Sequence, residues 1–153
     1  MKKILVEEVY QLAGPASVSV PDDTSLKEIV NRFAHEPGLR AIFLFDSKRR
    51  FAGMIRRVDL VKWLYLKLFG KTGGGTASTG EALRFAFAEK AKDLARGDSE
   101  SMGVHPGDIL QTAMDQMITH GEAIIPVVDE EGKILGDLRI SEVLLKALGL
   151  EES

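Results

Sequence analysis

The chain has 153 residues, of which 44% are hydrophobic, and this is typical of one globular domain or two small domains packed together. Its net charge of −3 and pI of about 5.7 exclude an overall positive field that would draw it to nucleic acid or anionic lipid. The absence of cysteine excludes disulfides, thiolate metal sites and cysteine nucleophiles, and a cytoplasmic location is the simplest expectation.

We expect neither an export signal nor a membrane span. The N-terminal run MKKILVEEVY contains two glutamates and is too short for a signal peptide. The most apolar later run, at 63–69, is far shorter than the ~20 residues that cross a bilayer.

The first predicted elements are a strand and a helix. Residues 18–23 are typical of a strand that enters a turn. The apolar residues after it recur at the spacing of one buried helix face: Leu26, Ile29, Val30 and Phe33. Proline and glycine at 37–38 end this helix.

A hairpin and a second helix follow. The apolar runs 41–46 and 51–55 are joined by a charged turn and predict two antiparallel strands. Residues 58–69 predict a helix with few charged side chains. Such a helix must be covered on two sides, and we expect the segment inserted after it and a second subunit to do so.

The middle of the chain separates two similar halves. Residues 70–80 are almost all small and predict a mobile loop. Residues 81–96 have helix-forming composition, with Leu83 and Phe87 one turn apart, and predict a helix that packs beside the first half.

The second half repeats the same elements. Its first helix has core positions displaced by 84 residues from those of the first half: Leu110, Ala113, Met114 and Met117. Gly121 ends this helix, runs 124–129 and 133–138 predict a hairpin, and a short helix begins at 141.

The repeat is visible in the sequence itself. GMIRRVDLV at 53–61 and GDLRISEVL at 136–144 share one layout at a constant offset. Five identical pairs fall at turns and core positions of the two halves: Gly38 with Gly121, Ile42 with Ile125, Asp46 with Asp129, Gly53 with Gly136, and Arg56 with Arg139.

These paired motifs resemble a tandem pair of CBS domains, the Bateman module named after cystathionine β-synthase. Segments 6–10 and 91–95 are similar to the lead-in segments that precede each copy in that family. The resemblance implies an α/β (α+β) fold of two β-α-β-β-α repeats about a pseudo-twofold axis. The repeats would span 1–69 and 91–153, with the glycine-rich loop and inserted helix at 70–90 between them.

The resemblance also implies clefts that bind adenine-containing ligands such as AMP, ADP, ATP or S-adenosylmethionine. In the family motif, a Ser or Thr contacts phosphate or ribose and an Asp three residues later takes the ribose hydroxyls. Here the acid position falls on Asp59 and, as a glutamate, on Glu142. The hydroxyl position falls on Arg56 and Arg139, which departs from the family pattern in both copies.

Physical chemistry gives these arginines a role. A strand that enters a helix presents unpaired N–H groups and the positive end of the helix dipole, and an arginine adds a charged donor fork suited to phosphate. This favours ATP, ADP or a dinucleotide over AMP. The predicted binding residues are Val20, Ile42, Ile55, Arg56, Arg57 and Asp59 in the first copy, and Val104, Ile125, Pro126, Leu138, Arg139 and Glu142 in the second.

A simpler interpretation of the same residues stays open. Asp59 and Glu142 could be first-turn acids that favour the helix dipole by ~0.3–1 kcal/mol. The arginines could be solvated or paired with neighbouring acids.

Other functional motifs have weaker support. The basic residues at 48–50 and 56–57 have no interleaved aromatic residue other than Phe51, so a charged hairpin turn is favoured over a nucleic-acid surface. GKT at 70–72 follows a helix and lacks the first glycine of a phosphate loop. The three histidines have no metal-ligand spacing, and no hydrolytic triad can be assembled.

We therefore expect a stand-alone regulatory module that is not an enzyme, requires no cofactor and binds an adenine nucleotide. It would act as a homodimer on an unidentified target protein, without nucleic-acid or membrane partners. The expected dimer surface is Trp63, Leu64, Leu66 and Phe69. An alternative is an interaction scaffold in which Arg56 and Arg139 fill the clefts, and an enzyme built on the glycine-rich loop is a distant third.

Overall fold

The computed structural model describes residues 3–10, 16–70, 79–95 and 101–150. The first half contains η1 (Val6–Glu8), β1 (Ser17–Pro21), α1 (Leu26–His35), β2 (Ala41–Phe45), β3 (Phe51–Arg56) and α2 (Arg57–Phe69), where η marks a short 3-10 helix. The remainder contains α3 (Thr79–Ala86), η3 (Ala91–Asp93), α4 (Leu110–His120), β4 (Ile124–Val128), β5 (Ile134–Arg139) and α5 (Ile140–Ala147). No helix among these is long and apolar enough to cross a membrane.

The predicted mixed α/β architecture is confirmed. In the first repeat, β1 is parallel to β2, and β2 is antiparallel to β3. In the second repeat, β4 and β5 form the corresponding hairpin. The strand that would correspond to β1 is reduced to one parallel bridge between Val104 and Val127. Pro106 lies two residues beyond Val104 and has no N–H with which to continue the ladder.

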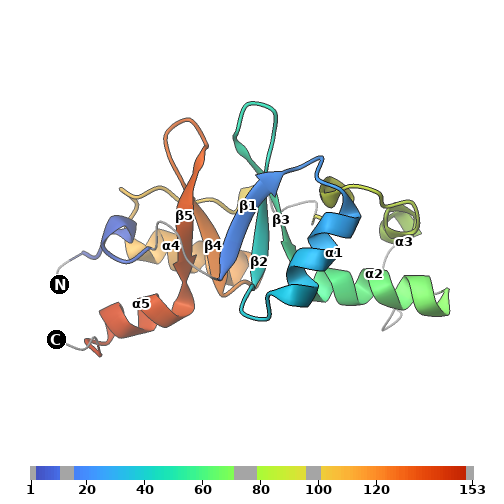
Figure 1. Ribbon diagram of the computed structural model, residues 1–153. Coiled ribbons are helices and arrows are strands. Elements are labelled where there is room, and N and C mark those ends of the chain that lie inside the picture. The colour runs from blue at the N-terminus through green and yellow to red at the C-terminus, as the bar shows by residue number, and fades with distance from the viewer. Residues whose placement is uncertain (1–2, 11–15, 71–78, 96–100, 151–153) are drawn as a thin grey trace.

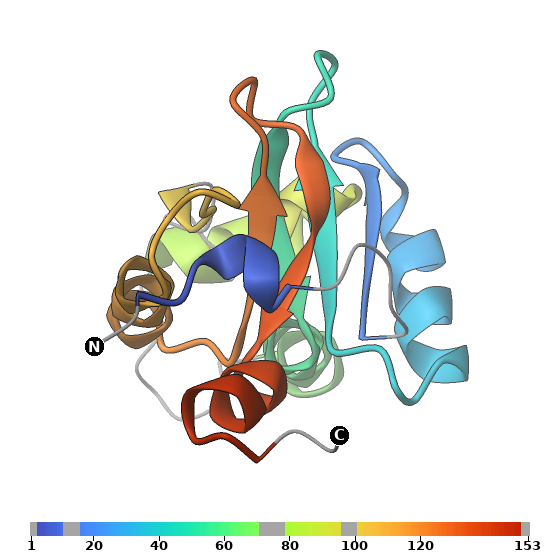
Figure 2. The ribbon, with the colours of Figure 1, turned by 90° about the vertical axis from the view of Figure 1, so that its left-hand side faces the viewer.

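The two hairpins lie side by side with their turns at the same end of the molecule, and α2 and α5 lie at the opposite end (Figure 1). Helices α1 and α4 cover opposite sides of the strands (Figure 2). The Phe51 amide donates to the Gly132 carbonyl at 2.8 Å, which joins one hairpin to the other. The second repeat is therefore packed directly against the first through its sheet.

Each lead-in segment packs against the repeat that it does not precede. Val6 of η1 is fully buried in a core cluster that includes α4, β4 and β5. Its amide donates to the Asp108 carbonyl at 2.9 Å. In the same way, Ala91 and Leu94 are buried in the cluster formed around α1 and β2. We call η1 and η3 the exchanged lead-in segments.

Two details of the predicted core are wrong. Leu110, Ala113 and Met117 are buried as predicted, but Met114 is 40% exposed because it lies on the outer side of α4. The inserted helix ends at Ala86 instead of extending to 96, and Leu83 and Phe87 are exposed.

The inserted helix α3 is held by Phe85 and not by the predicted pair Leu83 and Phe87. Phe85 is only 3% exposed and belongs to the core cluster around α1. The helix packs against α2, so one of the two predicted covers of α2 is present. Residues 71–78 of the predicted mobile loop lie outside the described residues.

Candidate functional site

The first candidate site is the corner where β3 runs directly into α2. Arg56 precedes the first residue of the helix, and Asp59 lies in its first turn. The Asp59 carboxylate accepts the backbone N–H of Arg56 at 2.7 Å and pairs with the Arg56 guanidinium at 3.2 Å. Only 3% of the Asp59 side chain is exposed. The acid that the family motif assigns to ribose is therefore used here to cap a helix.

The Arg56 guanidinium also reaches the second repeat. Its Nη1 pairs with Oε1 of Glu122, just before β4, at 2.6 Å. Burial alone would lower the pKa of Arg56, but hydrogen bonds and charge from Asp59 and Glu122 raise that pKa above its usual value. Arg56 is thus a fixed cation between the two repeats.

The second corner, where β5 enters α5, has the same plan. Arg139 Nη2 pairs with Oε1 of Glu142 at 2.7 Å, and its Nε lies 3.2 Å from Oδ1 of Asp137. Asp137 is 1% exposed and also accepts a hydrogen bond from the Ser17 hydroxyl of β1. Asp137 therefore also connects the two repeats, whereas both ion-pair partners of Arg139 lie in the second repeat.

Each corner has more negative than positive side-chain charge. Arg56 faces the carboxylates of Asp59 and Glu122, and Arg139 faces two carboxylates in the same way. About a fifth of each arginine side chain is exposed. Both guanidinium groups are neutralised from within the protein, as the simpler interpretation of the sequence anticipated.

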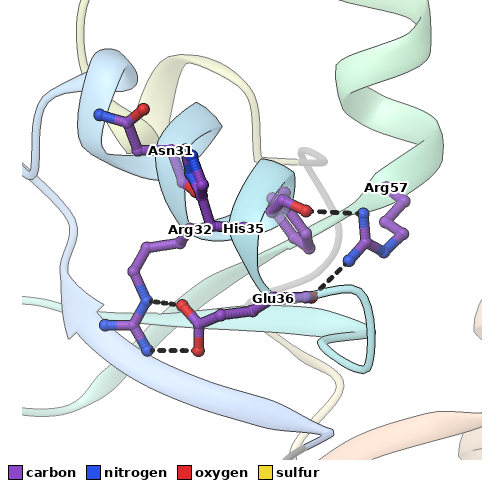
Figure 3. Close-up of polar contacts among 6 residues, drawn as sticks. Asn31, Arg32, His35, Glu36 and Arg57 are labelled. Atoms are coloured by element: carbon purple, nitrogen blue, oxygen red, sulfur yellow. Dashed lines mark hydrogen bonds and ion pairs between the residues drawn. The ribbon is translucent and has the colours of Figure 1, made fainter.

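Arg57 is bound by backbone carbonyls at the end of α1 and in the turn after it (Figure 3). Its guanidinium donates to the backbone carbonyls of Phe33, Glu36 and Leu39 at 3.0, 2.7 and 2.8 Å. It also lies over the Phe33 ring, with 5.2 Å from Cζ to the ring centroid. Carbonyls at the end of a helix lack intrahelical donors, so Arg57 satisfies the end of α1 and the turn after it.

The apolar residues predicted to line the clefts lie in the core. Ile42, Ile55, Ile125 and Leu138 have no exposed surface, and Val104 is 1% exposed. Pro126 is also buried, whereas Val20 is half-buried. These buried side chains therefore support the site from beneath and have little surface with which to contact a ligand.

The predicted dimer residues divide into two pairs. Trp63 and Leu66 pack partly against the core of the first repeat. Leu64 and Phe69 are 48% and 61% exposed and remain available to a partner.

Two carboxylates of the corners were missed in the sequence. Asp137 stands inside a predicted strand, and an acid at an inward strand position was a usable signal. Glu122 precedes a strand and gave no local signal, because its partner Arg56 lies in the other repeat. Within the described residues, no group of three or more histidine, cysteine or acidic side chains is placed to hold a metal ion.

Comparisons with known proteins identify the family and the fold. The family model described as CBS domain matches residues 6–66 and 98–149. No curated protein gives a significant match. A CBS domain-containing protein from Thermotoga maritima is similar at 27% identity over 98% of each chain, with a TM-score of 0.72.

Two further solved structures share the fold and contain adenosine compounds. CBSX2 in complex with AMP is 18% identical over 97% of this chain and 99% of that one, with a TM-score of 0.73. The CBS domain pair of protein MJ0100, in complex with 5′-methylthioadenosine and S-adenosyl-L-methionine, is 13% identical over 98% and 100%, with a TM-score of 0.66.

Proposed function

This chain belongs to the CBS domain family, and from that premise we propose that it is a regulatory module without catalytic activity that binds an adenosine-containing ligand. The proposal is supported by the AMP, 5′-methylthioadenosine and S-adenosylmethionine complexes of proteins with this fold. The observation that carries it in this chain is the duplicated corner. In both repeats, an arginine at a helix N-terminus stands three residues before an acid.

The charges of the corners favour a ligand with little phosphate. The sequence alone favoured ATP or ADP because it supplied an arginine at each corner. Since each arginine already faces two carboxylates, a polyphosphate would meet net negative charge. AMP, or an adenosine compound with no phosphate, fits this balance better.

Binding at the first corner would uncover Asp59. Its side chain is only 3% exposed and is covered by Arg56, so ribose hydroxyls reach it when Arg56 turns aside. That movement would also break the Arg56–Glu122 pair, which connects the repeats. Ligand occupancy would then alter how the repeats pack, within the limit set by the ligand's differential affinity for the two arrangements.

We expect the module to act as a homodimer on an unidentified target. Val61, Leu64, Leu68 and Phe69 leave a face of α2 that is at least 48% exposed at each of these positions. Trp63 and Leu66, which the sequence also predicted for this surface, are less favoured because both pack inward.

The decisive experiment is a thermal-shift and calorimetry panel of AMP, ADP, ATP, S-adenosylmethionine, 5′-methylthioadenosine and cyclic dinucleotides on the full chain. At least one adenosine compound is expected to raise the melting temperature. Asp59→Asn keeps an oxygen for the Arg56 amide and is expected to weaken binding about tenfold or more at the first corner. Glu142→Gln tests the second corner, and Glu28→Gln, in the first turn of α1, is the matched control.

Three outcomes are informative. If an adenosine compound binds but neither corner variant weakens the binding, the ligand lies elsewhere. The proposed binding function would then hold, and the proposed site would be wrong. No stabilisation by any compound would overturn the proposal. Release of a chemically altered nucleotide would contradict the absence of catalysis.

The second candidate function is an interaction scaffold without ligands. It is favoured by the burial of Asp59 and by the internal pairing of both arginines. In that case, Arg56→Ala would destabilise the chain but would change no ligand affinity, because there is none to change.

A further inference from the structure

Residues in and beside the two hairpin turns line two clefts. The strand-to-helix corners lie at the opposite end of the hairpins (Figure 1). The larger cleft, of about 640 Å³, is lined by both hairpins and by the segment that precedes α4. The smaller cleft, of about 270 Å³, is lined by β1 and the same two hairpins. Neither cleft contains a residue of the ligand sites proposed above.

The two clefts are counterparts in the internal repeat. Three positions of the larger cleft are matched by bulkier residues at the corresponding positions of the smaller cleft. The pairs are Gly103 with Ser19, Val128 with Phe45, and Gly132 with Arg49. The smaller cleft is therefore partly filled by the protein's own side chains.

Arg49 occupies the smaller cleft in the manner of a ligand. Its Cζ lies 5.9 Å from the centroid of the Phe45 ring, within the range of a cation–π contact. Its backbone has φ 65°, a left-handed conformation that its counterpart Gly132 adopts with φ 84°. Glycine accepts this conformation freely, whereas arginine does not. The backbone of Arg49 is strained at a position where the other repeat has glycine, and this indicates that the Arg49 side chain has a role.

The larger cleft offers an open place for a similar group. Gly103 and Gly132 contribute no side chains, and Phe51 and Val128 form an apolar wall. A Cβ added to Gly103 would lie 3.2 Å from Val128 Cγ2, so the glycine also keeps that wall uncovered.

The polar wall of the larger cleft is mainly acidic. Three carboxylates line it, from Asp46, Glu130 and Glu131, against the single cation Arg50. Arg50 is paired with Asp46 at 3.1 Å, and Lys133 pairs with Glu131 at 3.0 Å. Glu130 has no ion-pair partner within the described part of the chain. Amide hydrogen bonds from Arg50 and Lys48 keep the pKa of Asp46 below its usual value, so this carboxylate stays ionised.

We propose that the larger cleft binds a guanidinium group, as carried by an arginine side chain or a small arginine derivative. The planar cation would lie against Phe51 and donate to the carboxylates, which suit its fixed fork of N–H groups. A lysine ammonium is a compact, strongly hydrated charge and fits a flat apolar wall less well. The smaller cleft already carries a guanidinium of its own, that of Arg49.

An NMR titration of the full chain tests the proposal with agmatine, N-acetyl-arginine amide, an arginine-containing peptide and the lysine counterparts of each. The arginine compounds are expected to shift the amides of Phe51, Gly103 and Gly132, about tenfold or more tightly than the lysine compounds. If the peptide binds more tightly than agmatine, the natural ligand is an arginine side chain of a protein. If agmatine binds as tightly as the peptide, the natural ligand is a free small molecule. No shift with any guanidinium compound would overturn the proposal.

Variants separate this cleft from a non-specific acidic surface. Gly132→Arg installs the occupant of the smaller cleft and is expected to weaken binding about tenfold or more. Arg49→Gly is the matched control and is expected to leave binding in the larger cleft unchanged. Glu130→Gln introduces no backbone strain and is expected to weaken binding, whereas Asp115→Asn, outside the cleft, is not. Unchanged affinity in both Gly132→Arg and Glu130→Gln would contradict the assignment.

Discussion

Arg57 joins the start of α2 to the end of α1 through hydrogen bonds to three backbone carbonyls. Arg57→Ala would leave these acceptors without their charged donor, and we expect a loss of about 2 kcal/mol in the free energy of unfolding. Arg57→Lys should recover little of this, because one ammonium cannot span three carbonyls in a fixed geometry. Urea denaturation measures both. An alanine variant as stable as the original chain would contradict this role for Arg57.

Asp93 predicts a pH dependence of stability. The amides of Glu89 and, to a smaller extent, Lys90 lower its pKa below its usual value, against the opposing effect of burial. A carboxylate whose pKa is lowered by folding stabilises the folded state above its unfolded pKa, and the contribution disappears as the pH falls through the folded pKa. Asp93→Ala should therefore be destabilising at pH 7 and nearly neutral at a pH below the folded value.

Denaturation at a series of pH values checks this prediction. A cost of Asp93→Ala that persists unchanged in strong acid would show that the side chain acts through packing instead of charge.

The sequence predicted the residues of the corners better than their partners. Arg56, Asp59, Arg139 and Glu142 were found because they repeat at one offset and stand at helix starts. The electrostatic state of Arg56 could not be predicted, because its partner Glu122 lies in the other repeat. Only the folded structure brings that carboxylate to 2.6 Å from Arg56.

At the scale of elements, spacing predicted helices best where one face is buried and the other exposed. α1 has Leu26, Ile29 and Phe33 buried at the expected positions. The inserted helix was placed less well because it contacts the protein through a narrow strip. Of Leu83, Phe85 and Phe87, which lie close together in this segment, only Phe85 is buried. Helix composition does not reveal which apolar residue meets a neighbouring element.

Phe85 is therefore predicted to anchor α3. Phe85→Ala should destabilise the chain by about 3–5 kcal/mol, because it removes a buried aromatic ring from the core around α1. Leu83→Ala is the matched control on the same helix and, being 56% exposed at that position, should change stability by less than about 1 kcal/mol. Equal effects of the two substitutions in thermal denaturation would return α3 to the orientation expected from the sequence.

At the scale of the whole molecule, the pair of Arg56 and Glu122 predicts an energetic coupling between the two repeats. Glu122→Gln and Arg56→Gln should each destabilise the chain, since each leaves the other charge less well paired. The double variant should be less destabilised than the sum of the two, by about 0.5–3 kcal/mol.

A double-mutant cycle measured by denaturation gives this coupling directly. Repeating it with a saturating adenosine ligand tests the proposed signal, because a ligand that displaces Arg56 should reduce the coupling. Strict additivity in the free protein would mean that the pair contributes nothing to joining the repeats.

The positions of η1 and η3 have a consequence for how the chain can be divided. Val6 completes a core made mainly by later residues, and Ala91 and Leu94 complete one made mainly by earlier residues. A fragment cut between the two sequence copies would keep its own lead-in segment, which would have no core to pack against. The same fragment would lose the lead-in segment that completes its own core. Neither half is then an independent folding unit, so we expect the two to melt together and a compound that tightens one half to protect the other from unfolding.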